Sequence, residues 1–460
     1  MSASTPQRTI LYSIDGRYKP CYFLLVAIPD QLLRVLRADN PWLDGRPLAA
    51  WFAHHLPATV IPRRPLPRAD GRVCLVVGPR QAGKSTLIWL TLERTGEACL
   101  LLNCEEPSVR EWLDSPAAFV ADCETLAPGV PALFFEEVQR LPDAGLFLKG
   151  LVDRRPGKTV YATGSSNFDL EAQTRESLAG RAVRHLLLPL SLEELGATVK
   201  GPSRLAEQAM DDRVRTCQVL GSYAPVVLSP HPPRTLAELV EAFVVRDASD
   251  RFRIRHVAGF HKVLELAASQ IGNLTNYSEW AALAGVSNDT VTEYTRLLEE
   301  THVVRLVRPF VGGKRAEITS TPKVYFLDNG IRNQLFGGFG AVEGRADHGA
   351  LFENLVYSEL AKLTNPLLHT VRYWRSKAGA EVDFVIEHQG RILACEAKAG
   401  DARGRLSRSV RSFIDAYAPE RLLVVNRVSC PDQHIGATRI QFLRPWELHH
   451  VVREALGGRG

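Results

Sequence analysis

Residues 78–86 constrain the fold of this chain more than any other part of the sequence. They read Gly-Pro-Arg-Gln-Ala-Gly-Lys-Ser-Thr, which satisfies the pattern G-x-x-x-x-G-K-[ST], and they directly follow the apolar run Val73–Val77. A strand that ends in a glycine-rich loop and continues as a helix turns its backbone N–H groups inward around an anion. The sequence therefore predicts a phosphate-binding loop at the end of a strand in a parallel α/β sheet.

Each position of this loop has a physical role in holding a nucleotide. Gly78 and Gly83 supply the tight backbone, Lys84 reaches the β- and γ-phosphates, and the helix that begins here points its positive end at the anion. The Ser85 hydroxyl is expected to bind Mg²⁺. We expect ATP to contact nine residues: Gly78, Pro79, Arg80, Gln81, Ala82, Gly83, Lys84, Ser85 and Thr86.

The size and composition are those of a globular protein of several domains. At 460 residues the chain is too long for one core, so two to four domains are expected. Apolar residues make up 45% and charged residues 23%, and no apolar run approaches the ~18 residues that a bilayer requires. The first residues lack the basic and then apolar order of a secretory signal. We expect a cytoplasmic protein without a membrane partner.

A second apolar strand, at 132–135, ends in the acidic pair Glu136 and Glu137. Hydrolysis of ATP needs one carboxylate near Mg²⁺ and a second one that orients the attacking water. Glu136 is the candidate for the magnesium side and Glu137 the candidate catalytic base. The alternative is a solvated acidic pair at a strand end, which the phosphate loop upstream makes less favourable.

Two further features belong to the same predicted sheet. The strand at 159–163 ends in a polar tip, where Ser165 is a candidate sensor of the γ-phosphate or of the attacking water. Arg181 could act as an arginine finger across a subunit boundary or be a surface cation, and both interpretations stay open. The apolar run at 185–190 would supply a fifth parallel strand.

The middle of the chain has the spacing of a winged helix. Amphipathic helices are expected at 262–271, 277–285 and 288–301, followed by two strands around a wing at 312–315. The third helix carries several acids, which DNA phosphates would repel, so we expect a structural winged helix with a basic wing.

The C-terminal part carries acids in the order used by metal-dependent nucleases. Glu353 lies on an expected helix, Asp383 on a strand, and Glu396 and Lys398 on the next strand. Residues two apart on a strand share one face, so Glu396 and Lys398 would meet. Glu353, Asp383 and Glu396 are candidate metal ligands, and Lys398 could orient the water. The set matches the PD-(D/E)xK nuclease pattern, although such folds also persist as binding modules.

Four motifs together resemble a known family. They lie at 78–86, 135–140, 163–166 and 176–181, and they look like the prokaryotic AAA-type ATPases that carry a C-terminal domain of unknown function. The similarity extends over most of the chain beyond about residue 40. It implies a homo-oligomer, with hexameric rings common among such ATPases, in which Mg²⁺-dependent ATP hydrolysis gates a nuclease-like domain acting on DNA. The opposing hypothesis is an ATP-switched regulatory or partner-binding protein whose nuclease fold is inactive.

These observations predict an α/β protein with five regions along the chain. They are an N-terminal extension packed on the ATPase (1–60), a P-loop ATPase core with a parallel sheet (61–190), a helical lid and connector (191–255), a winged helix (256–330) and a PD-(D/E)xK nuclease-like domain (331–460).

Overall fold

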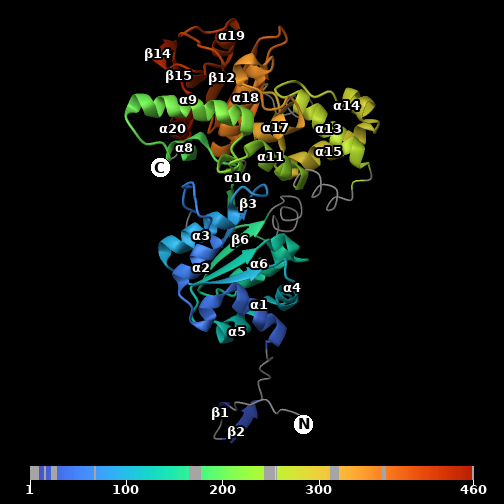
Figure 1. Ribbon diagram of the computed structural model, residues 1–460, viewed down its shortest axis with the longest axis vertical. Coiled ribbons are helices and arrows are strands. Elements are labelled where there is room, and N and C mark those ends of the chain that lie inside the picture. The colour runs from blue at the N-terminus through green and yellow to red at the C-terminus, as the bar shows by residue number, and fades with distance from the viewer. Residues whose placement is uncertain are drawn as a thin grey trace.

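The computed structural model describes residues 10–14, 17–21, 28–66, 69–164, 178–242, 254, 256–310, 321–364 and 369–457. Figure 1 shows two bodies, a lower one built on a twisted parallel sheet and an upper one that holds the elements from α8 onward. The N-terminal hairpin consists of β1 (Ile10–Ile14) and β2 (Arg17–Cys21). In the part of the chain that is described, no helix is long and apolar enough to cross a membrane.

The lower body is an α/β layer structure whose sheet is entirely parallel, as predicted. The strand order is β4-β5-β6-β3-β7, so the phosphate-loop strand β3 lies between β6 and β7. All of β3 is buried, which explains its continuous apolar sequence. The five strands are β3 (Val73–Val77), β4 (Cys99–Asn103), β5 (Ala132–Glu136), β6 (Thr159–Gly164) and β7 (Ala182–Leu186).

Helices cover both faces of this sheet. Alternate residues of β3 point to opposite faces: Leu75 belongs to the core beneath α1, α5 and α6, whereas Val76 belongs to the core beneath α2 and α3. Trp51 of α2 packs edge-on against Trp89 of α3, with ring centroids 4.9 Å apart. The helical elements are α1 (Asp30–Asp39), η1 (Pro41–Asp44), α2 (Leu48–His55), α3 (Lys84–Thr95), α4 (Pro107–Trp112), α5 (Pro116–Leu126), η2 (Val138–Arg140) and α6 (Ala144–Asp153).

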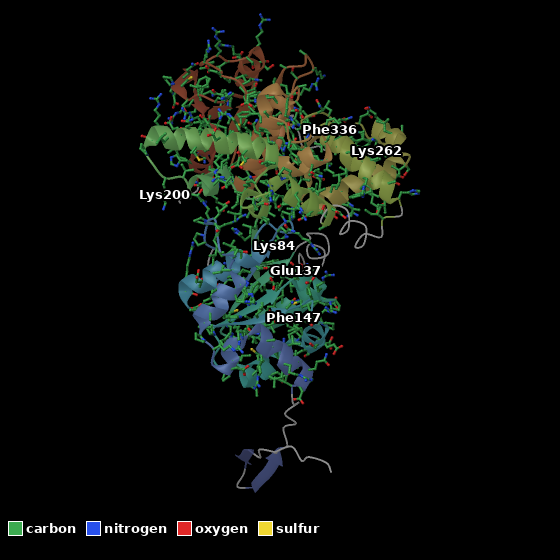
Figure 2. The ribbon with its side chains drawn as sticks, viewed as in Figure 1. Lys84, Glu137, Phe147, Lys200, Lys262 and Phe336 are labelled. Atoms are coloured by element: carbon green, nitrogen blue, oxygen red, sulfur yellow. The ribbon has the colours of Figure 1, made fainter. Side chains whose placement is uncertain are left out.

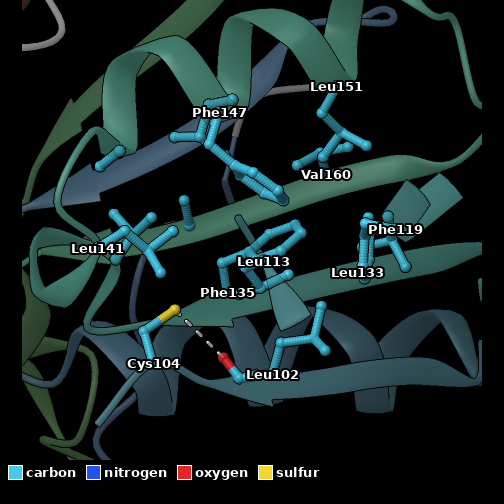
Figure 3. Close-up of a cluster of buried hydrophobic side chains, with 14 of the residues drawn as sticks. Leu102, Cys104, Leu113, Phe119, Leu133, Phe135, Leu141, Phe147, Leu151 and Val160 are labelled. Carbon is cyan, nitrogen blue, oxygen red and sulfur yellow. Dashed lines mark hydrogen bonds between the residues drawn. The ribbon is translucent and has the colours of Figure 1, made fainter. Parts of the chain in front are cut away.

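An aromatic cluster fixes the end of β5, where the predicted acids follow. Figure 3 shows Phe135 of β5 beside Phe119 of α5 and Phe147 of α6. Their centroids lie 5.6 to 5.8 Å apart at steep angles, the geometry that aromatic rings prefer. Phe135 is fully buried, so the residue that follows it leaves the core at a fixed position.

The fifth strand differs from its prediction. It spans Ala182–Leu186 instead of 185–190, and the buried residues after it leave the sheet. Leu188 packs in one core with Val307 and Tyr325 of the upper body, and Leu190 packs in another with Leu355. The residues after β7 are therefore apolar because they pack between the two bodies. Sequence periodicity alone does not distinguish such a buried segment from a buried strand.

The next elements belong to the upper body, and most of them pack around a core that includes Trp280 and Phe260. Leu192, Leu195 and Val214 belong to a separate core with Leu355. The three helices and the two strands of the predicted winged helix are present, while the expected wing at 312–315 lies outside the described residues. The elements are α8 (Leu192–Gly196), α9 (Ser203–Leu220), α10 (Ala224–Val227), α11 (Pro232–Val240), α13 (Val257–Ser269), α14 (Tyr277–Ala284), α15 (Asn288–Glu300), β8 (Val304–Val307), β9 (Lys323–Phe326), α17 (Asn329–Leu335) and η4 (Val342–Gly344). We call residues 257–326 the three-helix segment.

The C-terminal part is a mixed six-stranded sheet with the order β10-β11-β12-β13-β15-β14. The strands β10, β11 and β12 form an antiparallel meander, and β13 then pairs parallel to β12. Helices α18 and α20 cover one face, and α19 covers the other. The elements are α18 (His348–Leu363), β10 (Thr370–Arg375), β11 (Glu381–His388), β12 (Arg391–Ala397), α19 (Arg408–Tyr417), β13 (Arg421–Val425), β14 (Cys430–Ile435), β15 (Thr438–Leu443), η5 (Pro445–Glu447) and α20 (Leu448–Ala455).

Candidate functional site

The phosphate loop joins β3 to α3 in a conformation that needs glycine at two positions. Gly78 has φ +150°, and a Cβ there would lie 2.1 Å from the carbonyl oxygen of Leu187. Gly83 has φ +92° and caps α3, whose first residue is Lys84. A side chain at either position would distort the loop, because L-residues rarely adopt such φ values and Gly78 has no room for one.

Lys84 and Ser85 are the first two residues of α3, directly after the phosphate loop. The ammonium of Lys84 is buried and donates to the carbonyl oxygens of Gly78, at 3.2 Å, and Pro79, at 2.9 Å. The Ser85 hydroxyl donates to a carboxylate oxygen of Glu136. Figure 2 shows Lys84 and Glu137 at the end of the lower body that faces the upper body.

The acidic pair continues from β5 with an abrupt change in backbone direction. Burial raises the pKa of Glu136, the hydrogen bond from Ser85 opposes that rise, and the charge of Glu137 adds to it. Glu137 has φ +52°, a left-handed conformation that costs a residue other than glycine roughly 1 to 2 kcal/mol. Its N–H donates to Thr163 Oγ1 at 3.1 Å, and its carboxylate accepts from Gln139 Nε2.

This arrangement fits a magnesium-bound nucleotide. Two adjacent carboxylates repel each other, and a cation beside the Ser85 hydroxyl would lower the free energy of the pair. The positive end of α3, the inward-facing loop and Lys84 would hold the phosphates. Bound magnesium would supply Lewis-acid stabilisation of the phosphate oxygens.

The structure gives a role to two residues for which the sequence predicts none. Thr163, at the end of β6, fixes the backbone of Glu137; its position beside β5 becomes evident only once the strand order is known. Arg63 is almost fully buried and donates to the carbonyl oxygens of Ala82, at 2.8 Å, and Leu188, at 2.9 Å. Arg63 thus connects the phosphate loop to the segment that enters the upper body.

The remaining two predicted residues of the ATPase do not join this cluster. Ser165 lies outside the described residues. Arg181 precedes β7, and its carbonyl oxygen accepts from Val73 N at the opposite end of β3 from the phosphate loop. Its side chain pairs with Asp153 at 2.6 Å, and both are more than one third exposed. Arg181 therefore does not reach the phosphate loop of its own chain.

The upper body brings the four C-terminal candidates together. Asp383 Oδ2 accepts from the N–H of Ala397 at 2.7 Å, and Lys398 Nζ lies 2.6 Å from Glu396 Oε1. The other carboxylate oxygen of Glu396 is buried without a hydrogen-bond partner. Burial raises the pKa of Asp383 well above its usual range, and the charges of Glu396 and Glu353 raise it further. We call Glu353, Asp383, Glu396 and Lys398 the carboxylate cluster.

A buried lysine from the three-helix segment also lies at this cluster. Lys323 contacts the Glu381 carboxylate and lies 3.6 Å from Glu353 Oε1, with only 4% of its side chain exposed. Tyr325 donates its hydroxyl hydrogen to Glu353. The sequence offers one indication of this contact, a lysine at the start of an apolar strand. A lysine buried in such a strand needs an acidic partner, because lysine is almost never fully buried unpaired. The sequence does not show which acids it would meet.

As arranged, these side chains do not fit a metal ion. Among the residues that the structure describes, no group of three or more His, Cys, Asp or Glu side chains is placed to hold one. Lys323 and Lys398 balance part of the negative charge instead. We therefore derive no reaction step through a metal bound by Glu353, Asp383 and Glu396.

The parallel sheet, its phosphate loop and the acids at the end of β5 define a P-loop ATPase domain of the AAA type. In agreement, residues 70–196 match the family described as AAA domain. Residues 211–341 and 348–438 match two domains of unknown function, DUF8612 and DUF4143.

The chain is also similar to several bacterial proteins. An uncharacterized protein of Mycobacterium tuberculosis is 29% identical over 370 residues, which cover 79% of this chain and 78% of that protein. An uncharacterized protein of Haemophilus influenzae is 24% identical over 309 residues, which cover 63% and 74%. A solved Walker-type ATPase of Pyrococcus abyssi is 16% identical, with a TM-score of 0.37, over 57% of this chain and 90% of that one. A TM-score at this level carries no functional argument.

Proposed function

We propose that this protein binds ATP with Mg²⁺ and hydrolyses it. The observation that carries the proposal is the contact between the Ser85 hydroxyl and Glu136 at the mouth of the phosphate loop. In this proposal Ser85 and Glu136 hold the magnesium side, and the loop with Lys84 holds the phosphates. Glu137 orients the attacking water with its carboxylate. The hydrogen bond from its N–H to Thr163 holds the backbone that positions this carboxylate. Ser165 remains the proposed sensor, and Arg181 could act only from a neighbouring subunit.

The test is nucleotide binding by the Lys84→Ala variant, measured by calorimetry with Mg²⁺ and ATP. Loss of the ammonium should weaken binding by about a hundredfold, because charge-assisted contacts to phosphate are among the strongest hydrogen bonds. Lys200→Ala is a matched control, since Lys200 is exposed in the upper body. Unchanged binding in Lys84→Ala would refute the assignment.

We further propose that nucleotide state regulates the upper body through direct contacts. Arg63 links the phosphate loop to Leu188, and the N–H of Leu192 donates to Glu359 of α18 at 2.9 Å. Arg453 of α20 pairs with Glu193 of α8. Because Lys323 and Lys398 already balance acids of the carboxylate cluster, we infer an ATP-switched regulatory or partner-binding protein with a nuclease-like module.

A second candidate function is metal-dependent cleavage of DNA. It is supported by the convergence of Asp383, Glu396 and Lys398, and by the carboxylate oxygen of Glu396 that lacks a partner. Four exposed arginines that could attract phosphate follow β12: Arg403, Arg405, Arg408 and Arg411. This candidate requires the side chains of the cluster to rearrange around a cation.

The two candidates differ in one assay. Linear and single-stranded DNA would be incubated with the full chain and Mg²⁺ or Mn²⁺, with and without ATP. The regulatory proposal expects intact DNA alongside normal ATP turnover. Cleavage that disappears in both Asp383→Ala and Lys398→Ala would establish the nuclease instead.

A further inference from the structure

His302 is enclosed where the three-helix segment meets the lower body. Its side chain is 1% exposed, and its backbone is left-handed, with φ +60°. It lies just before β8, and Val307 of β8 shares a core with Leu188. Leu187, the residue before Leu188, lies beside the phosphate loop. Its N–H donates to the carbonyl oxygen of Val77, and its own carbonyl oxygen lies next to Gly78. The fold therefore brings β8 and the phosphate loop to the same short segment.

The hydrogen bond from Arg305 fixes the position of the imidazole proton. Arg305 Nη2 lies 2.9 Å from His302 Nδ1. A guanidinium can only donate, so Nδ1 of a neutral imidazole is the acceptor and Nε2 carries the hydrogen. Nε2 is buried and has no hydrogen-bond partner. A buried donor left without an acceptor destabilises the folded protein, which points to an acceptor supplied by a ligand.

The charges around His302 indicate what kind of acceptor this is. Burial lowers the pKa of His302 well below its usual range, and the positive charges of Arg305, Lys84 and Arg184 lower it further. Three cations from the lower body and the three-helix segment thus act on one neutral imidazole. The nearby acid Glu299 instead accepts from the N–H of Leu306. An anion held by Lys84 would lie among these positive charges and could accept the Nε2 hydrogen.

We propose that His302 Nε2 donates a hydrogen bond to a phosphate oxygen of the nucleotide bound at the phosphate loop. This inference rests on the proposed nucleotide binding and extends it to regulation. The same nucleotide then contacts α3 of the lower body and the start of β8 of the upper body. Bound nucleotide would tie the three-helix segment to the ATPase domain, and its release would remove that contact.

The experiment measures ADP and non-hydrolysable ATP-analogue binding to the full chain by calorimetry. His302→Leu removes the donor and should weaken binding about tenfold or more, as expected for a hydrogen bond to a charged group. His302→Gln retains an N–H at a similar reach and should restore most of the affinity. His261→Leu is the matched control, because His261 is another histidine of the three-helix segment whose Nε2 lacks a partner. It should bind as the wild type does.

Wild-type affinity in folded His302→Leu would overturn the proposal. If that variant does not fold, ¹⁵N-histidine spectra of the wild-type chain decide. A nucleotide-dependent shift of an Nε2 resonance that His302→Gln lacks supports the contact, and its absence overturns it. Failure of nucleotide binding as such is recognised separately, because the wild type would then behave like Lys84→Ala.

Discussion

The two acidic sites of this protein balance their charge in different ways. At the phosphate loop, Glu136 accepts a hydrogen bond from the Ser85 hydroxyl and is adjacent to Glu137. The hydroxyl and the two carboxylates are oxygen ligands of the kind that Mg²⁺ prefers. In the upper body, Glu353 and Glu396 each lie beside a lysine ammonium. In the proposed function the first site gains its balancing cation from bound magnesium, whereas lysines of the chain itself lie beside the acids of the second site.

From this difference we expect the charge at the phosphate loop, but not at the carboxylate cluster, to depend on a bound ligand. A site completed by magnesium and nucleotide changes its electrostatics with every turnover. A site completed by lysines keeps them, provided that the three-helix segment stays in place, because Lys323 belongs to β9. We therefore expect the upper body to sense the nucleotide through its contacts with the lower body and not through a metal of its own.

The largest expected effect sharpens the assignment of the first site. Glu137→Gln should lower ATP turnover by about a hundredfold or more while ATP binding stays near the wild-type level, because only the water-orienting carboxylate is lost. Turnover is measured as phosphate release, and binding by calorimetry. Glu97→Gln, at an exposed position before β4, is the control and should leave both unchanged. Normal turnover in Glu137→Gln would remove Glu137 from its proposed role.

The next prediction tests whether Lys323 balances the acids of the carboxylate cluster. Lys323→Met should destabilise the fold by about 3 kcal/mol, because it removes the buried ammonium beside Glu353 and leaves Glu381 with Arg375 alone. Unfolding in urea measures this, and Lys262→Met, an exposed lysine on α13, should change stability by less than about 0.5 kcal/mol. A Lys323→Met protein as stable as the wild type would show that the lysine does not balance these acids.

A third prediction concerns the buried ion network that joins α8 to α18 and α20 within the upper body. Burial alone would raise the pKa of Glu359, but Lys362 and His449 together hold it at about 2. Burial would lower the pKa of His449, but hydrogen bonds to Glu193 and Glu359 raise it above its usual value. Stability from Glu359 is therefore present above about pH 4.5 and lost as the pH falls toward 2. Stability from His449 is present below about pH 6.5 and lost at higher pH.

The wild type should consequently be most stable between about pH 4.5 and 6.5, and thermal unfolding measured from below to above this window tests it. In Glu359→Gln, the decrease in stability below and above this window should be smaller by about 2 kcal/mol. Glu238→Gln, an exposed acid on α11, is the control and should keep the wild-type profile. Identical profiles for Glu359→Gln and the wild type would show that this network does not set the window.

The smallest effect is expected for Arg181→Ala. Its ion pair with Asp153 is exposed, so stability should stay close to the wild-type value. Turnover should stay unchanged, because Arg181 lies at the far end of β3 from the phosphate loop. A large loss of turnover with normal stability would instead show that Arg181 acts on the site of a neighbouring subunit.

The sequence predicted what depends on neighbours along the chain. The phosphate loop between a strand and a helix, the acids at the end of β5 and the parallel character of the sheet follow from local patterns, whereas the order β4-β5-β6-β3-β7 does not. Arg63, Lys323 and His302 could not be found this way, because their partners come from distant segments. The run at 187–190 was assigned to a strand because a buried strand and a buried contact between bodies share the same apolar sequence.

The most direct test of the two-site comparison counts metal ions. Mn²⁺ binding to the full chain would be measured by calorimetry with and without a non-hydrolysable ATP analogue, in the wild type and in Asp383→Asn. We expect one Mn²⁺ per chain that requires the nucleotide and is unaffected by Asp383→Asn. A second, nucleotide-independent Mn²⁺ that disappears in Asp383→Asn would contradict the account and assign a metal centre to the carboxylate cluster.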